Sequence, residues 1–245
     1  MKSLVCIGLI VSMVGSTSTA IASTPNSSVL SKTPTSISRI NTVSSVKVQG
    51  KKLVSQDNLL SAELNVPVIS GLLNFELQKQ INSVLERDAI SFKDKVSKLA
   101  KEYDAEEIDP EFKRLPFCVN IDYKVSYNRN NFLSLYIDYY EYTGGAHGST
   151  TRKCYNIDLK TGKLLNLKDI FSKNSNYKEI INETIKTEIQ KNPEKYFEES
   201  FQGIVDDQCF VVEGNDLVIY FQQYEIAPYA SGILEFKIPF SKIKK

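Results

Sequence analysis

The chain has 245 residues, of which 42% are hydrophobic and 10% aromatic, and its formal net charge is +1. This apolar content is sufficient for one large or two small folded domains. Removing residues 1–22 takes away Lys2 and no acidic residue. The neutral chain that remains lacks the basic footprint of a nucleic-acid-binding protein, so we expect no nucleic-acid partner.

Residues 1–22 have the features of a secretory signal peptide. Lys2 is followed by the apolar segment Leu4–Val14 and by Ala20-Ile21-Ala22, a cleavage motif of small residues. The apolar segment is too short to span a bilayer, which favours cleavage over a permanent anchor. We therefore expect a secreted or envelope-associated protein outside the cytoplasmic membrane, with no stable membrane span after cleavage. The Ser/Thr-rich residues 23–45 predict a disordered linker.

A first domain is predicted over residues 46–148. Apolar residues alternate from Leu60 to Val66, which indicates a strand that ends at Pro67. From Phe75 to Tyr103 they recur at steps of three and four, which predicts one long amphipathic helix with Asn74 as its N-cap.

An antiparallel meander is expected after this helix, with its odd-numbered face on the helix. Apolar residues alternate over 117–125 and again over 132–142. A two-residue loop between these strands would place apolar side chains opposite polar ones, so a longer loop pairing Val125 with Leu133 is expected. The same argument across the corner 144–148 pairs Ile137 with Tyr155.

A second domain, packed as one unit with the first, is predicted over residues 149–245. It would contain a helix from Tyr177 to Ile189, capped by Asn174 or Ser175, a hairpin turn at Gly214-Asn215 and a final strand over 233–238. A helix followed by a sheet thus occurs twice. The expected fold class is α+β, with antiparallel sheets and a long amphipathic helix packed on one face.

Three cysteines, Cys118, Cys154 and Cys209, follow the signal segment. An odd number permits at most one internal disulfide. The expected register separates Cys118 from Cys154 by a full strand, about 9–10 Å, which is too far for a disulfide. We therefore predict that these two cysteines are not bridged.

Three motifs in order resemble a known family: residues 142–148 (YTGGAHG), 156–171 (NIDLKTGK, then LKDIF) and 224–232 (YEIAPYASG). They are similar to the paired domains of unknown function in secreted and envelope proteins of Gram-positive bacteria. Relatives include the extracytoplasmic part of lysozyme-sensing, RsiV-like anti-sigma factors and the module ahead of a peptidoglycan deacetylase. The resemblance implies an α+β fold and a non-catalytic role in binding a partner at the cell wall. The implied partner is a lysozyme-like protein or peptidoglycan.

His147, the single histidine, is the obvious candidate for catalysis. A cell-wall hydrolase using His147 with a nearby carboxylate is the alternative function. Ser149 lies in the same loop, but no G-x-S-x-G elbow is present. We expect His147 to bond neighbouring backbone or to contact a ligand, and we expect no enzyme activity. One histidine without C-x-x-C or H-E-x-x-H spacing predicts no zinc site, and no cofactor is expected.

The candidate binding residues lie on the even-numbered strand face and in one loop. Tyr136, Tyr140 and Tyr142 share a face with short polar residues, a composition suited to binding proteins or sugars. The alternative is that the second helix covers this face. The loop 227–232 adds Pro228 and Tyr229, and Tyr229 would either contact the partner or pack against the 144–148 corner. The acidic run 102–111 would be a solvated segment or would attract a cationic partner.

Overall fold

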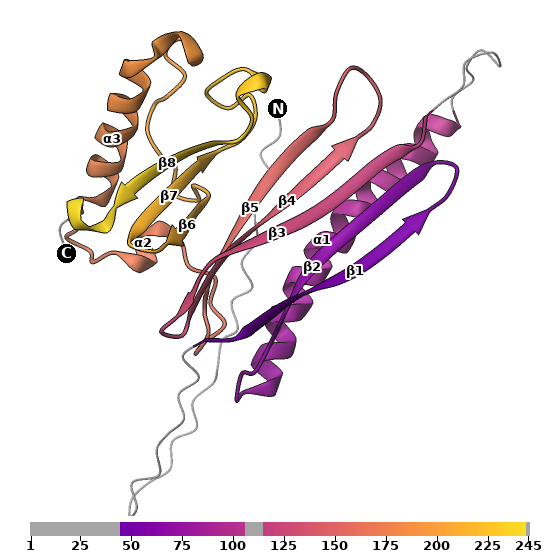
Figure 1. Ribbon diagram of the computed structural model, residues 1–245, viewed down its shortest axis with the longest axis horizontal. Coiled ribbons are helices and arrows are strands. Elements are labelled where there is room, and N and C mark those ends of the chain that lie inside the picture. Colours follow the sequence, from indigo (N-terminus) through magenta and orange to yellow (C-terminus); the bar gives the residue numbers. More distant parts are fainter. Residues whose placement is uncertain (1–44, 106–114, 244–245) are drawn as a thin grey trace, which may run out of the picture. The chain divides into compact units, whose positions relative to one another are not determined.

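The structure is a computed structural model that describes residues 45–105 and 115–243. The predicted signal segment, the predicted linker up to residue 44 and positions 106–111 of the acidic run lie outside these ranges. The described part contains two sheets, and its mixture of helices and sheets confirms the α+β class (Figure 1). The first sheet has the order β1-β2-β3-β4-β5, formed by Lys47–Gln56, Leu60–Ser70, Phe117–Arg129, Phe132–Tyr142 and Ser149–Asp158. The second has the order β6-β7-β8, formed by Phe210–Glu213, Asp216–Phe221 and Leu234–Pro239.

The helices are α1 (Phe75–Asp104), α2 (Leu167–Ile170) and α3 (Tyr177–Lys191). Three short 3₁₀ turns follow α3: η1 (Pro193–Lys195), η2 (Tyr229–Ser231) and η3 (Phe240–Lys242). None of the helices in the described ranges has the length and apolar character needed to cross a membrane.

Helix α1 connects β2 and β3, which pair in parallel, so the first sheet is mixed and not antiparallel as expected. The predicted helix is confirmed, and the Asn74 side chain accepts a hydrogen bond from Leu77 N at 3.0 Å. Strand β2 runs past Pro67 to Ser70 instead of ending at the proline. Its pairing with β3 stops at Leu64, so at Pro67 only β1 is a neighbour and the missing N–H need not break a ladder.

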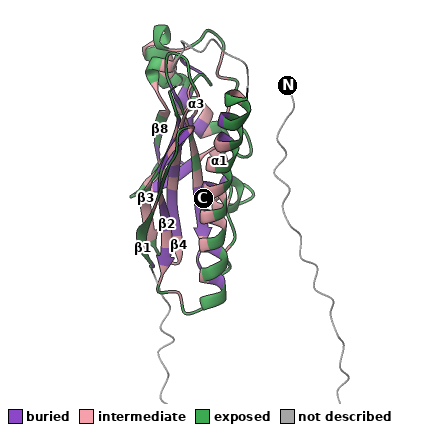
Figure 2. Ribbon diagram, turned by 90° about the vertical axis from the view of Figure 1, so that its right-hand side faces the viewer, coloured by how far each residue is buried: buried purple, intermediate pink, exposed green. Residues whose placement is uncertain are grey.

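The apolar face of α1 lies on the sheet face formed by odd-numbered residues of β3, β4 and β5, as the alternation predicted, and by even-numbered residues of β2 (Figure 2). This core is completed by aliphatic side chains of β2, β3 and β4. Its fully buried members include Val66, Leu85, Val96, Leu133, Leu135 and Ile137.

The turn between β3 and β4 differs from the prediction. Arg129 pairs with Phe132, so the loop is the two-residue turn Asn130-Asn131, and both residues have positive φ (56° and 59°). These are the dihedrals of a type I′ turn, which asparagine tolerates. A bulge between Val125 and Tyr127 then restores the parity, and Val125 pairs with Leu135 rather than Leu133.

The register across the Gly144–Gly148 corner is shifted by two residues from the expected one. Leu135, not Ile137, pairs with Tyr155. The faces are nevertheless as predicted, because a shift of two keeps every side chain on its own side of the sheet.

The second sheet lies between α3 and the first sheet. Helix α3 begins after Asn176, not after Asn174 or Ser175. The odd-numbered side chains of β7, such as Leu217 and Ile219, pack with buried residues of α3. The even-numbered side chains of β7, Val218 and Tyr220, contact side chains of the first sheet. The even-numbered face of the first sheet is therefore covered in part by a sheet rather than by the second helix.

The boundary expected at residues 148 and 149 falls immediately before β5. Strand β5 pairs with β4 in the first sheet, so this sheet extends to Asp158. The division of the chain into two domains stays a prediction.

A buried polar network joins the two sheets. Ser134 on β4 is 0% exposed and Asn156 on β5 is 3% exposed. Ser134 Oγ donates to Asn156 Oδ1 at 2.6 Å and accepts from Val212 N on β6 at 2.9 Å. Asn156 Nδ2 donates to Phe210 O at 2.8 Å. The backbone of β6 thus finds on the first sheet the hydrogen bonds that an edge strand would otherwise lack.

The same junction carries a disulfide between Cys154 on β5 and Cys209, directly before β6, with a Cα–Cα distance of 5.4 Å. Cys118 is a free thiol, so the prediction of no bridge between Cys118 and Cys154 is confirmed. Burial and the nearby charge of Glu63 raise the pKa of the Cys118 thiol, which disfavours its reactive thiolate form.

We predict that Asn156→Ala lowers the free energy of unfolding by about 2–4 kcal/mol, because Ser134 Oγ and Phe210 O lose buried partners. Urea unfolding at neutral pH measures this loss. The matched control is Asn65→Ala, which removes an exposed hydrogen bond to Asp122 and should cost about 0.5 kcal/mol or less. Equal losses for the two variants would contradict the role of the buried network.

We also predict that replacing both Cys154 and Cys209 with alanine destabilises the chain by about 4 kcal/mol, the loop-closure estimate for a separation of 55 residues. Cys118→Ala is the control and should change the unfolding midpoint little. Wild-type stability of the double variant would show that hydrogen bonds alone hold the two sheets together.

Candidate functional site

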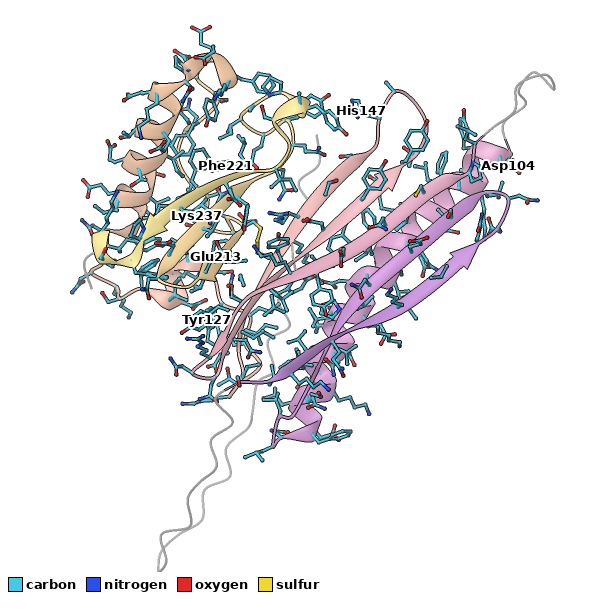
Figure 3. All side chains as sticks on the ribbon, viewed as in Figure 1. Asp104, Tyr127, His147, Glu213, Phe221 and Lys237 are labelled. Atoms are coloured by element: carbon cyan, nitrogen blue, oxygen red, sulfur yellow. A yellow bond between two sulfur atoms is a disulfide. The ribbon has the colours of Figure 1, made fainter. Side chains whose placement is uncertain are left out.

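Two segments far apart in the sequence meet at one end of the first sheet. One is the corner after β4, which carries His147, and the other is the connection between β7 and β8, which carries Tyr224 and Tyr229. We call these three residues the aromatic corner. Figure 3 shows His147 on the loop between β4 and β5, on the side of this loop that faces the turn η2.

The rings of His147 and Tyr229 stack, with centroids 3.8 Å apart and planes inclined by 18°. Both side chains also hydrogen-bond one backbone oxygen: Gly148 O accepts from Tyr229 OH and from His147 Nδ1, each at 2.9 Å. In the neutral imidazole, a proton on Nδ1 makes Nε2 an acceptor. The hydroxyl of Tyr224 lies 3.5 Å from this Nε2 atom.

Glycines shape the corner in two ways. Gly144 and Gly145 have φ angles of +99° and +84°, which other L-residues rarely adopt. Gly148 has no such angle, but a Cβ atom there would lie 2.4 Å from the hydroxyl of Tyr140. Gly148 therefore allows the corner to lie directly against the Tyr140 ring, and this places His147 opposite Tyr229.

Tyr224 is held in an exposed position by a tight turn. Glu225 N donates to Gln222 O at 3.1 Å, and Gln222 N donates to Glu225 Oε2 at 2.6 Å. The backbone of Tyr224 has φ +63°, an uncommon angle for a residue with a large side chain, and 57% of the residue is exposed. The buried Ile226 and Ala227 fix the segment that follows.

Two glutamine side chains attach this segment to the outer edge of β5. Gln223 Oε1 accepts from Thr150 N at 2.7 Å. Gln222 bonds both backbone groups of Arg152, accepting from N at 2.9 Å and donating to O at 2.8 Å. The aromatic corner thus rests on two sheets linked by hydrogen bonds, which limits the motion of its rings.

The structure brings most of the predicted binding residues together. His147 and Tyr229 are in direct contact, and Tyr140 lies under Gly148. Tyr142 OH donates to Gly145 O within the corner at 3.0 Å. Pro228 is exposed and precedes η2. Their role in binding remains a prediction.

Tyr136 lies apart from this group, about 13 Å along β4 from Tyr140. Its ring contacts Tyr220 of the second sheet at 5.6 Å, and the Arg152 guanidinium stacks 3.6 Å from its centroid. Asp138 holds Arg152 by two hydrogen bonds of 2.7 Å. Burial works against the charge of Arg152, but this ion pair outweighs it, so the net pKa is raised. Tyr136 therefore belongs to the packed layer between the sheets.

Sequence reasoning did not select Tyr224, Gln222 or Gln223 as site residues. Tyr224 opens the 224–232 motif, but nothing in a sequence indicates that a tyrosine will adopt positive φ. The glutamines act by pairing with a strand edge, which depends on how the two sheets pack. In residues 45–105 and 115–243, no three His, Cys, Asp or Glu side chains gather closely enough to hold a metal ion.

Two family models match the chain in succession. Residues 53–150 match the model described as deacetylase PdaC, and residues 168–241 match a protein of unknown function, DUF3298. The chain resembles paired PdaC and DUF3298 domains. Anti-sigma-V factor RsiV from Bacillus subtilis (strain 168) is 29% identical over 191 residues, and peptidoglycan-N-acetylmuramic acid deacetylase PdaC from the same organism is 24% identical over 198 residues.

These alignments cover 73% and 78% of this chain, but only 62% of RsiV and 40% of PdaC. Two solved DUF3298 structures share the fold. The one from Bacteroides fragilis has a TM-score of 0.64 at 19% identity and covers 81% of this chain and 92% of its own. The one from Pseudomonas aeruginosa has a TM-score of 0.57 at 14% identity, with coverage of 82% and 94%. The recognition made from the three motifs is confirmed.

We predict that Gly148→Ala lowers the free energy of unfolding by about 1–3 kcal/mol, because the new methyl group must displace the Tyr140 ring. Chemical denaturation measures the change. In a Tyr140→Ala background the same substitution should cost about 0.5 kcal/mol or less, since the obstacle is gone. An unchanged cost in that background would exclude the ring contact as the reason for the glycine.

Proposed function

We propose that the chain is a non-catalytic binding module of the cell envelope that acts outside the cytoplasmic membrane. The similarity to RsiV and to the PdaC and DUF3298 models supports an envelope-related module. The observation that carries the proposal is the aromatic corner, in which Tyr229 stacks on His147 while Tyr224 stays exposed. Aromatic side chains fixed in advance lose little conformational entropy on binding.

The surroundings of His147 support binding rather than hydrolysis. The side-chain contacts described for its ring are with Tyr224, Tyr229 and Gly148 O. A hydrolase of the alternative kind would hold a carboxylate against one of the two ring nitrogens, to orient the imidazole as a base. In the described ranges, the partners of these nitrogens are a carbonyl and a phenol.

The proposed partner is a lysozyme-like protein, and the resemblance to RsiV-like sensors supports this choice. Such a protein is cationic and has a sugar-binding groove that a projecting tyrosine can enter. Attraction between the acidic run 102–111 and the cationic partner would raise the association rate, whereas buried aromatic contacts would slow dissociation. Binding to a cell-wall glycan is the competing possibility.

We predict that Tyr229→Ala weakens binding to a c-type lysozyme by about 2 kcal/mol, mainly through faster dissociation, without unfolding the chain. Surface plasmon resonance with immobilised lysozyme measures both rates. Tyr127→Ala is the matched control, because Tyr127 pairs with Ser134 near the opposite end of the β3–β4 pair.

Neutralising the acidic run should slow association modestly, and this effect should fade with added salt.

Absence of lysozyme binding at micromolar concentrations would remove this partner. If the chain then sedimented with insoluble peptidoglycan, and Tyr229→Ala abolished that, the aromatic corner would be a glycan site. Hydrolysis of peptidoglycan that is lost in a stably folded His147→Ala variant would contradict the non-catalytic proposal itself.

A further inference from the structure

A second surface feature lies on the helix side of the first sheet, away from the face that carries the second sheet. A sheet of five strands is about 19 Å wide, whereas one helix with its side chains is about 10–12 Å wide. Helix α1 packs chiefly against β2, with further contacts to β3 and β4. The helix alone therefore does not reach across β5, whose helix-side residues Tyr155 and Ile157 form the floor of a pocket and are each 1% exposed.

The turn after β5 closes over these two residues but leaves an opening beside the helix. Gly162 lies against α1, so closely that a Cβ atom there would be 2.5 Å from Leu77 Cδ1. An open pocket of about 170 Å³ lies between the helix, the turn and β5. The residues lining it are Leu77, Gln80, Ile81, Val84, Leu85, Tyr155, Ile157, Thr161, Gly162 and Leu164.

The lining is suited to an alkyl chain. Apart from Gln80 and Thr161, which are exposed, its side chains are aliphatic or the ring of Tyr155. The Tyr155 hydroxyl bonds Asp88 Oδ2 and Tyr139 OH, each at 2.9 Å, so it does not need a partner from the pocket. Apolar cavities of about 150 Å³ are known to bind benzene. This pocket is large enough for about six carbons of a chain.

Two cations neighbour pocket-lining residues along the chain. Arg87 follows Gln80 and Val84 on one stripe of α1, and its side chain is 70% exposed. Its contact with Asp88 is long, 3.5 Å, and the same carboxylate is also paired with Lys153. Lys160 adjoins Thr161 and is exposed, and no ion pair of its side chain is found among the described residues.

We propose that this pocket binds a free medium-chain carboxylate of about six to eight carbons, with its alkyl end against Tyr155 and Ile157 and its carboxylate at the rim near Arg87 and Lys160. The apolar lining, the volume of about 170 Å³ and the nearby cations Arg87 and Lys160 together define this ligand class. The proposal is independent of the aromatic corner and of the partner bound there.

The test uses octanoate and 1-octanol as probes of the purified chain. We expect octanoate to raise the thermal midpoint, since a ligand that binds only the folded state stabilises it. Val84→Phe fills the pocket and should lower the affinity for octanoate about tenfold. The same substitution at the exposed Val54 on β1 is the matched control. The double variant Arg87→Ala, Lys160→Ala should lower the affinity for octanoate about fivefold and leave the affinity for octanol unchanged.

A fluorescence titration keeps the proposal testable if Val84→Phe fails to fold. The chain has no tryptophan, so Leu164→Trp at the pocket edge supplies a single reporter whose emission should shift to the blue as octanoate saturates. No shift in either measurement, or equal octanoate effects in the Val84→Phe and Val54→Phe variants, would overturn the site. If the chain bound phosphatidylglycerol vesicles more tightly than octanoate, and Val84→Phe abolished the vesicle binding, the ligand would be a lipid chain and not a free carboxylate.

Discussion

The arrangement of the chain depends on the attachment of β6 to the first sheet. Buried backbone groups must be hydrogen-bonded, and β6 meets this requirement through the side chains of Ser134 and Asn156. This attachment fixes the position of the second sheet, and with it the segment that carries Tyr224 and Tyr229. Since His147 lies on the β4–β5 loop of the first sheet, its contact with Tyr229 depends on the two sheets being joined.

The disulfide and the hydrogen-bond network act on this junction in different ways. Cys154–Cys209 lowers the entropy of the unfolded chain, whereas the network stabilises one relative position of β5 and β6 in the folded state. Arg152 adds a third contribution, because its guanidinium lies over the rings of both Tyr136 and Tyr220. Together these contacts explain why the part of the even-numbered strand face around Ser134, Tyr136 and Asn156 is covered by the second sheet.

Hydrophobic periodicity predicted α1, its Asn74 cap and the faces of β3, β4 and β5, because burial acts on one side chain at a time. Register depended on features that periodicity does not contain. The bulge between Val125 and Tyr127 permits a two-residue turn that simple alternation excludes. The contact of Tyr229 with the 144–148 corner was predicted as one of two alternatives. The exposed position of Tyr224 was not, because it requires a backbone angle that tyrosine rarely adopts.

The hydrogen bonds between β5 and the side chains of Gln222 and Gln223 have a consequence for solubility. An edge strand with free N–H and C=O groups is a template for pairing with another chain, and so for aggregation. On β5, Gln222 and Gln223 occupy the backbone groups of Thr150 and Arg152. The opposite edge strand, β1, instead carries three lysines, a charge pattern that discourages such pairing. Side-chain amides thus block one edge of the first sheet, and charge repulsion keeps other chains from pairing with the opposite edge.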